Sequence, residues 1–389
     1  MRRILDFGLT SGLAAAALVG LSATAASAGE TRGFAISWFQ PAYYVGDDDC
    51  PNGVSKERDW KALFTAQGKT LEEIKALFEH PLSKEFRHAA LERGAHGEDI
   101  CAYPETVHDT DWPTVQGKVS HGGNLDGTAD GKATPKTCTH QKFAGADGAS
   151  SVDNQLYRVM GCSKIHRGSK AKDGRDAFGI EYLNERMREG LVTYLIEVSG
   201  IDSIQNSDNV TVGIYQGTDP LVQDGAGGVQ ADSTQHIATD KRWQATVHGR
   251  IKDGVLTTDP FDLDLRNDAV WLPEFHFKRA QLNVTFQPDG SLKGHFNAYQ
   301  DWASIFWGMA KTDFLLEKFS AGNCPAMYAA FKAMADGDPD PKTGQCTTIS
   351  SSYGLDAVPA FLIHPQEGKG AKTAQSDQPN QPIKAAAAQ

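Results

Sequence analysis

The residues LVTYLIEV at positions 191–198 are followed along the chain by VTVGIY at positions 210–215. Both runs are short and rich in β-branched and aromatic residues, which favours strands over helices. Gly200 and Gly217 lie just beyond their ends. Residues 243–248 alternate between apolar and polar side chains, as a strand with one buried face does. This part of the sequence therefore predicts several half-buried strands.

Two Asp-Gly pairs lie between further strand-like runs. They are Asp253-Gly254 and Asp289-Gly290. We expect each pair to form a two-residue type I′ turn, because glycine adopts positive φ without a steric penalty. Roughly seven short strands at this spacing, with no helical pattern between them, predict an antiparallel β-sandwich or jelly-roll-like core over residues 191–300.

Helical patterns flank the predicted core. Thr70 and Glu73 form a capping box ahead of an apolar helical face. Other helices are expected at residues 81–91, 152–160, 177–188, 302–319 and 325–334. The aromatic-rich opening, residues 31–44, is expected to form an edge strand or to cover the core. We therefore predict an α+β protein with a signal peptide (1–28), a helical and loop-rich N-terminal region (29–190), the β-sandwich (191–300), a C-terminal helical region packed on the core (301–364) and a disordered tail (365–389).

The first residues have the features of an export signal. Two arginines precede an apolar run, and Ala26-Ser27-Ala28 suits cleavage by a signal peptidase. The apolar run is too short to span a membrane. We therefore expect a soluble periplasmic or secreted protein, exported by general secretion or by the twin-arginine route. The net charge of −11 argues against nucleic acid or an anionic membrane as the main partner.

The chain has six cysteines, an even number that in an oxidising compartment suggests three disulfides. They are Cys50, Cys101, Cys138, Cys162, Cys324 and Cys346. Pairing between sequence neighbours is the simplest expectation, because it closes the shortest loops. The spacing contains no C-x-x-C, which argues against a thioredoxin-like centre or a zinc ribbon.

The segment from His96 to Cys162 is rich in glycine, histidine and acidic residues and has little apolar periodicity. A loop of this length is usually functional, disordered or held by bonds or ions. Its candidates for a catalytic or metal-binding role are His96, His108, Asp109, His121 and His140. No H-E-x-x-H spacing is present, so the indication of catalysis is weak.

Two stretches have oxygen-bearing side chains at alternate positions, which is the ligand type that calcium prefers. The first contains Asn124, Asp126 and Asp130, and the second contains Asp336, Asp338 and Asp340. Neither has the glutamate that closes an EF-hand loop. The sequence therefore offers calcium as a possible cofactor, and no other cofactor is indicated.

The chain has neither a G-x-S-x-G elbow nor a phosphate-binding loop. The first hypothesis is a non-enzymatic exported protein that binds a small molecule, a glycan or a protein. The candidate stacking residues for a sugar are Trp38, Trp112, Trp243 and Trp271, although core packing is the stronger expectation for each. The alternatives are an extracytoplasmic hydrolase that uses a His/Asp or metal site in segment 96–140, and a structural or assembly protein of the cell envelope.

Overall fold

A computed structural model describes residues 29–56, 58–81, 83–108, 111–267, 272–310 and 322–365. The predicted signal peptide (1–28) and all but the first residue of the predicted tail (365–389) lie outside these ranges. Asp109, a candidate site residue, and Trp271, a candidate stacking residue, also lie outside them.

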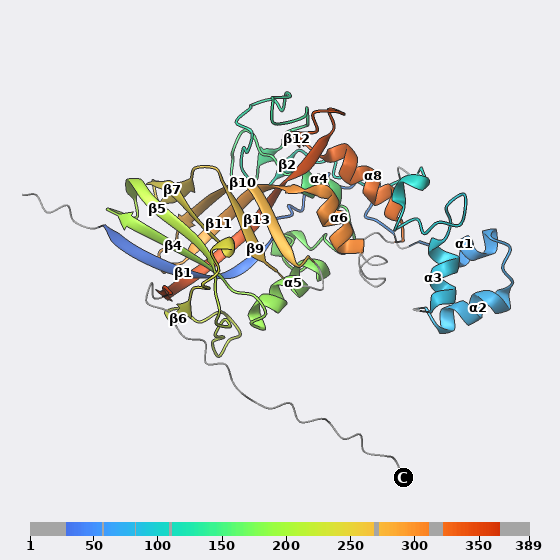
Figure 1. Cartoon of the computed structure of the whole chain (residues 1–389), viewed down its shortest axis with the longest axis horizontal. Coiled ribbons are helices and arrows are strands. Elements are labelled where there is room, and N and C mark those ends of the chain that lie inside the picture. Colours follow the sequence, from blue (N-terminus) through green and yellow to red (C-terminus); the bar gives the residue numbers. More distant parts are fainter. Residues whose placement is uncertain are drawn as a thin grey trace, which may run out of the picture.

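The fold is built on a closed antiparallel barrel of eight strands (Figure 1). In order around the barrel they are β1 (Glu30–Pro41), β4 (Tyr194–Ile201), β5 (Asn206–Gln216), β7 (Gln244–Lys252), β8 (Val255–Thr258), β10 (Glu274–Phe286), β11 (Leu292–Asp301) and β13 (Cys346–Ile363). Pairing of β13 with β1, from Ala360 opposite Gly33 to Tyr353 opposite Pro41, closes the ring.

This closure corrects the prediction of a sandwich or jelly roll. Strand β1 pairs with β4 on one side and with β13 on the other, so it is not an edge strand. Strand β13 has 18 residues and lies in the region 301–364, which was expected to be helical. Its serines, residues 350–352, obscure the strand pattern in the sequence, yet all three are buried. With both strands present, the sheet has no free edge and closes on itself.

The two Asp-Gly hairpins differ from each other. Asp253 and Gly254 join β7 to β8 with φ values of 52° and 81°, as the predicted type I′ turn requires. Between β10 and β11, Gln287 N–H donates to the carbonyl of Ser291, which encloses a three-residue loop. Only Gly290 in that loop has a positive φ, of 84°. The second hairpin is therefore longer than predicted.

Apolar side chains fill the barrel. Phe39 of β1 contacts five other rings, with centroid separations from 4.9 Å to Tyr353 up to 6.2 Å to Phe275. Aliphatic side chains from the other strands complete this core. A ligand is therefore to be sought outside the barrel.

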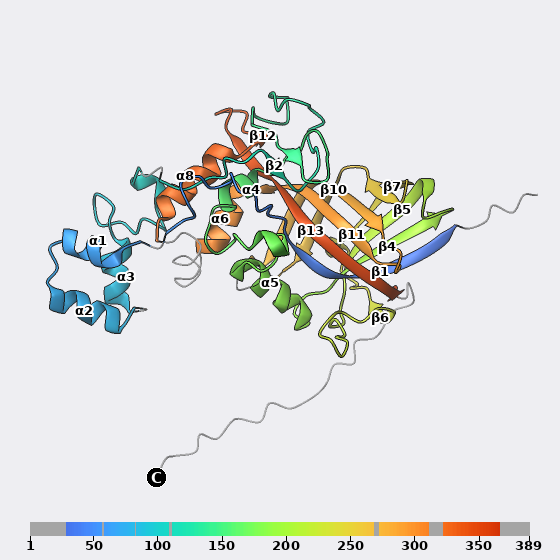
Figure 2. The same cartoon turned by 180° about the vertical axis from the view of Figure 1, so that it is seen from behind.

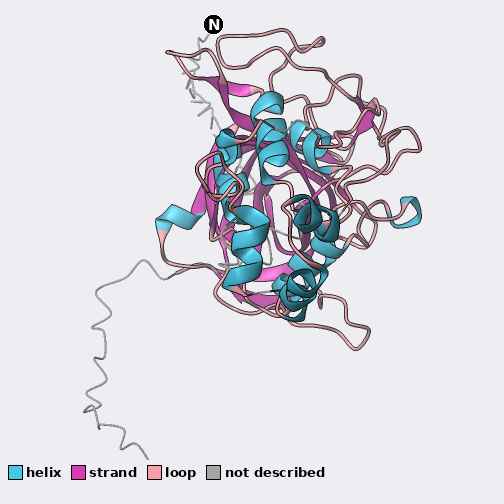
Figure 3. Cartoon of the chain, turned by 90° about the vertical axis from the view of Figure 1, so that its right-hand side faces the viewer, coloured by secondary structure: helices cyan, strands magenta, loops and turns pink. Residues whose placement is uncertain are grey.

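Short strands and helices surround the barrel. The strands are β2 (Val119–Ser120), β3 (Ala144–Gly145), β6 (Ser233–His236), β9 (Phe261–Arg266) and β12 (Gly337–Pro339). The helices are α1 (Trp60–Ala66), α2 (Leu71–Glu79), α3 (Lys84–Leu91), α4 (Gln155–Met160), α5 (Phe178–Arg188), α6 (Trp302–Ala310) and α8 (Cys324–Met334). Helices α1 to α3 project away from the barrel (Figures 1 and 2), and Figure 3 shows the helical side.

Most predicted helices are confirmed. The capping box of Thr70 and Glu73 is present at the start of α2. Helix α4 begins later than predicted, because Asn154 caps it. The helix predicted at 302–319 is described only as far as α6 extends. No helix in the described ranges combines the length and the apolar character needed to cross a bilayer.

All six cysteines form disulfides, but not between sequence neighbours. The pairs are Cys50–Cys162, Cys101–Cys324 and Cys138–Cys346. Their sequence separations are 112, 223 and 208 residues, so each bond joins segments that the fold brings together. The neighbour pairing was wrong because loop length does not reflect the contacts made by the folded barrel and its surrounding loops.

Candidate functional site

The glycine-rich segment packs against the outer face of β13 through α4. The backbone N–H of Gln155 donates to Ser350 Oγ at 2.9 Å. The side chain of Asn154 accepts from the backbone N–H of Ser352 at 3.3 Å. Asp153, directly before these residues, is thereby fixed beside the barrel. This docking places two features of chemical interest, a buried charged cluster and a surface groove.

The buried cluster contains three carboxylates, one imidazole and one ammonium group. They belong to Asp126, His140, Lys142, Asp153 and Asp336. Their side chains are at most 7% exposed. His140 Nε2 lies 2.7 Å from Asp153 Oδ1 and 3.8 Å from both Asp126 Oδ2 and Asp336 Oδ2. Lys142 Nζ lies 2.5 Å from Asp126 Oδ1 and 2.6 Å from Asp153 Oδ1.

Backbone groups hold the carboxylates of this cluster in place. Asp153 Oδ2 accepts from the N–H of Leu125 at 2.8 Å. Asp336 Oδ1 accepts from the N–H of Ser350 at 2.7 Å. Asp126 Oδ1 accepts from the N–H of Thr128 at 2.8 Å. The other oxygen of each carboxylate faces His140 Nε2.

Burial and mutual contact shift the pKa values in the cluster. Burial raises the pKa of Asp336 to about 7, although the charge of His140 opposes this. Burial acts to lower the pKa of His140, but the hydrogen bond to Asp153 and the charge of Asp336 outweigh it and raise that pKa. Burial acts to raise the pKa of Asp153, but hydrogen bonds from His140 and Lys142 outweigh it and lower that pKa.

The structure brings together only part of the predicted calcium-binding residues. Asp126 and Asp336, from the two separate stretches, both face His140. Asn124 Oδ1 accepts from Lys142 at 3.1 Å. The remaining three lie apart: Asp130 pairs with the exposed Lys132, Asp338 pairs with Arg279, and Asp340 accepts from backbone N–H groups in its own turn.

The predicted histidines do not form one site. His96 and His108 are exposed. His121 lies instead in a pocket of about 140 Å³ on the barrel wall. There its Nε2 is 3.0 Å from Asp173 Oδ1, and its ring stacks on that of His295. Burial, together with the neighbouring His121, lowers the pKa of His295 to about 4.

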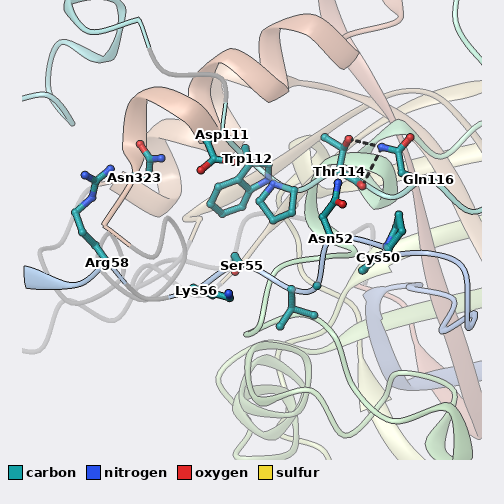
Figure 4. Close-up of a pocket in the computed structure, with 14 residues that line it drawn as sticks. Cys50, Asn52, Ser55, Lys56, Arg58, Asp111, Trp112, Thr114, Gln116 and Asn323 are labelled. Atoms are coloured by element: carbon teal, nitrogen blue, oxygen red, sulfur yellow. Dashed lines mark hydrogen bonds between the residues drawn. The ribbon is translucent and has the colours of Figure 1, made fainter.

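A larger groove, of about 600 Å³, lies between residues 50–58 and residues 111–116 (Figure 4). Its polar lining includes Asn52, Thr114 and Gln116, and Trp112 lies among them. Gln116 Nε2 donates to Thr114 Oγ1 at 3.0 Å. Asn52 has no side-chain hydrogen-bond partner among the described residues. These side chains can donate hydrogen bonds to a ligand and accept hydrogen bonds from it.

Both walls of the groove are anchored to the segment around α4. The Cys50–Cys162 disulfide ties the first wall, and the N–H of Ser55 donates to the carbonyl of Cys162 at 2.8 Å. In the second wall, Trp112 Nε1 donates to the carbonyl of Val159 at 2.8 Å. The N–H of Val115 donates to the carbonyl of Arg158 at 2.9 Å. The groove is therefore held open in the free protein.

His166, whose ring packs edge-on against that of Tyr43, should make the stability of the protein depend on pH. Burial lowers its pKa to about 3. In the unfolded chain the imidazole takes up a proton near pH 6.5, whereas the folded protein keeps it neutral. The free energy of unfolding should therefore fall as the pH drops below 6.5, by roughly 2 kcal/mol at pH 5 from this residue alone.

Denaturant unfolding of the wild type and His166→Gln at pH 7 and pH 5 measures this contribution. The variant should lose less stability between the two pH values than the wild type. His96→Gln is the control, because that imidazole is exposed, and it should behave as the wild type. Equal pH dependence in wild type and His166→Gln would show that His166 is not buried in the neutral form.

Sequence reasoning missed several residues of these sites. Lys142 could have been found, because it lies two positions after His140 in a non-helical segment and so can face the same side. Asp153 was not among the candidate site residues, because it lies in the predicted helix at 152–160, outside both oxygen-rich stretches. The groove residues Asn52, Thr114 and Gln116 follow no motif, because the two walls are about 60 positions apart in the chain.

No protein-family model, no curated protein and no solved structure matches the chain.

Proposed function

We propose that the mature chain is an extracytoplasmic binding protein that takes a polar, hydroxyl-rich ligand, of which a glycan is the main class, in the groove between residues 50–58 and 111–116. The observation that carries the proposal is the lining of the groove. Side-chain amides and a hydroxyl surround an indole in a space of about 600 Å³, a volume typical of ligand sites.

The chemistry of the lining suits sugar hydroxyl groups. Each hydroxyl both donates and accepts a hydrogen bond, and the amides of Asn52 and Gln116 also offer both functions. Trp112 lines the groove but is only 6% exposed, so polar side chains rather than stacking on the indole would carry most of the recognition. The lining also carries Lys56, Arg58 and Asp111, a net charge of one positive unit, so both neutral and acidic sugars belong to the ligand class.

The rigidity of the walls supports binding. A ligand that enters a preformed groove does not have to order the loops that hold it, so more of the contact energy appears as affinity. The disulfide of Cys50 and the hydrogen bond of Trp112 Nε1 both act in this way.

The hydrolase alternative has weaker support. His140 is 5% exposed and its three carboxylates at most 1%, so a polymeric substrate has no access to them. His96 and His108 are exposed and lie outside this cluster. His121 and Asp173 form a pair, but in a pocket about one quarter the size of the groove.

A glycan array followed by calorimetric titration tests the proposal. The mature protein should bind a defined group of glycans, and Asn52→Ala and Gln116→Ala should each weaken binding by roughly tenfold, because each removes hydrogen bonds to the ligand. Asn209→Ala is the matched control, because Asn209 is an exposed asparagine on β5 of the barrel. Failure to bind any glycan, or equal affinity of all three variants, would contradict the proposal.

A further inference from the structure

The buried cluster holds more acidic groups than basic ones. Three carboxylates, from Asp126, Asp153 and Asp336, face Lys142 and His140. Buried charges are tolerated only when they are paired or bind a metal. A divalent ion together with Lys142 balances three ionised carboxylates when His140 is a neutral imidazole.

The hydrogen bonding of His140 requires either a proton or a metal ion at its other ring nitrogen. Nδ1 lies 2.9 Å from the carbonyl oxygen of Cys138, which can only accept, so Nδ1 carries a proton. Nε2 then lies 2.7 Å from Asp153 Oδ1. Two lone pairs at this separation repel unless a proton or a metal ion lies between them. A backbone carbonyl at the second ring nitrogen is the usual arrangement for a histidine that binds a metal.

The separations of three of the facing groups suit one shared ion, because ligand atoms of Asp126, His140 and Asp153 all lie within 4.8 Å of one another. Metal–ligand bonds of about 2.0–2.1 Å place ligand atoms about 3.3 Å apart. The three carboxylate oxygens lie 2.7, 3.8 and 3.8 Å from His140 Nε2. Nε2, Asp126 Oδ2 and Asp153 Oδ1 therefore need to move by only a few tenths of an ångström to share one ion.

Unpartnered polar atoms point into the same place. Asp336 Oδ2 accepts no hydrogen bond in the described part of the chain, although Asp336 is completely buried. The hydroxyl of Tyr299 is also buried without a partner, and the charges of Asp126, Asp153 and Asp336 all act on it. A bound ion would satisfy the orphaned oxygen of Asp336, and Tyr299 could donate to one of the ligating carboxylates.

We propose that the cluster is a closed structural site for a divalent first-row transition metal of the zinc type. The ligands are His140 Nε2, Asp126 Oδ2 and Asp153 Oδ1, and the fourth is the unpartnered Asp336 Oδ2, which lies 3.8 Å from the same imidazole nitrogen. The imidazole ligand and the small ligand set favour such a metal over calcium, which prefers six to eight oxygen atoms. The ion would join the glycine-rich segment to the chain that enters β13, where the Cys138–Cys346 disulfide joins the same two segments.

Cobalt and zinc titration of the chelator-treated, disulfide-intact mature protein tests the site. We expect one equivalent of Co²⁺ to bind with the intense visible absorption of a tetrahedral site, and Zn²⁺ to displace it. Either metal should raise the melting temperature, whereas Ca²⁺ at the same concentration should not. The proposal would be overturned if the wild type did not bind one equivalent of Co²⁺ or Zn²⁺, or if it bound Ca²⁺ instead of these metals.

Lys142→Gln distinguishes a metal site from a closed network of ion pairs. Without metal, the variant should be less stable than the wild type, because two carboxylates lose their partner. Zn²⁺ should restore its stability and bind roughly tenfold more tightly than to the wild type, since a nearby positive charge is gone. Lys132→Gln, which removes an exposed lysine from the same segment, should change neither property. A destabilised Lys142→Gln that zinc does not rescue would contradict the proposal.

Variants of the ligands locate the ion. His140→Ala should abolish the cobalt spectrum, and Asp336→Asn, which keeps the shape of the side chain, should weaken metal binding at least tenfold if the carboxylate is a ligand. If His140→Ala does not fold, Asp336→Asn still tests whether the ion lies in this cluster. His96→Ala is the control for binding to an exposed imidazole. Unchanged metal binding by folded Asp336→Asn would place the ion elsewhere.

Discussion

Replacement of Phe39 by alanine should lower the free energy of unfolding by about 3–5 kcal/mol, which is the usual cost of removing a buried phenyl ring. Phe39 is 3% exposed and lies where β1 closes the barrel. Its ring stacks on Tyr353 at 4.9 Å and meets four other aromatic rings edge-on. Few side chains could move into the space that the ring leaves, so the variant would keep most of the cavity.

Denaturant unfolding of the disulfide-intact protein measures this loss. Phe39→Leu should cost much less, because leucine fills a large part of the volume. Phe361→Ala is the matched control, since Phe361 is 62% exposed on β13, and its effect should stay within about 0.5 kcal/mol. A loss for Phe39→Ala as small as that of Phe361→Ala would mean that the barrel interior is not tightly packed. A ligand cavity inside the barrel would then compete with the groove.

The sequence predicts the parts of the fold that depend on local pattern. Strands β4 and β5 contain runs rich in β-branched and aromatic residues. Asp253-Gly254 has the type I′ geometry that suits a two-residue hairpin, and Thr70 and Glu73 cap α2. In each case neighbouring residues determine the structure. These elements were predicted correctly because no distant contact changes their preference.

Barrel closure could not be predicted in the same way. Ser350 and Ser352 of β13 contact polar groups of the segment around Asn154 rather than solvent or an apolar core. Their hydrogen-bonding partners are about 200 positions away in the sequence. A strand of this kind lacks the alternation that reveals a half-buried strand. Without β13, the remaining predicted strands suggest two open sheets.

The charged cluster shows the same limit. Asp126 and Asp336 were predicted in two separate calcium-binding stretches, whereas His140 was a candidate for a catalytic or metal-binding role. Only the folded chain shows that these three side chains face one another. Their convergence depends on the Cys138–Cys346 disulfide and on the docking of α4, and neither follows from spacing.

Asn154→Ala should have an effect as large as that of Phe39→Ala, but for a polar reason. Asn154 is completely buried. Its Nδ2 donates to the carbonyls of Ala42 and His121 and to Ser120 Oγ, at 3.1–3.2 Å. Its Oδ1 accepts from the N–H groups of Tyr157 and Ser352. Alanine would leave several of these buried groups without partners, so we expect a loss of roughly 3–5 kcal/mol.

Hydrogen exchange, which shows where the structure of the variant loosens, tests the role of Asn154 more sharply than the overall loss of stability does. Asn154 joins β13, the end of β1 and the segment that carries both the groove wall and Asp153. Hydrogen exchange should therefore rise first in residues 111–160 of Asn154→Ala, whereas Phe39→Ala should loosen the barrel strands. Asn209→Ala, on the exposed surface of β5, should leave both regions unchanged. If exchange in Asn154→Ala rose uniformly, the segment would not be a separate layer held by this residue. The groove and the cluster would then depend on the stability of the whole barrel rather than on one buried amide.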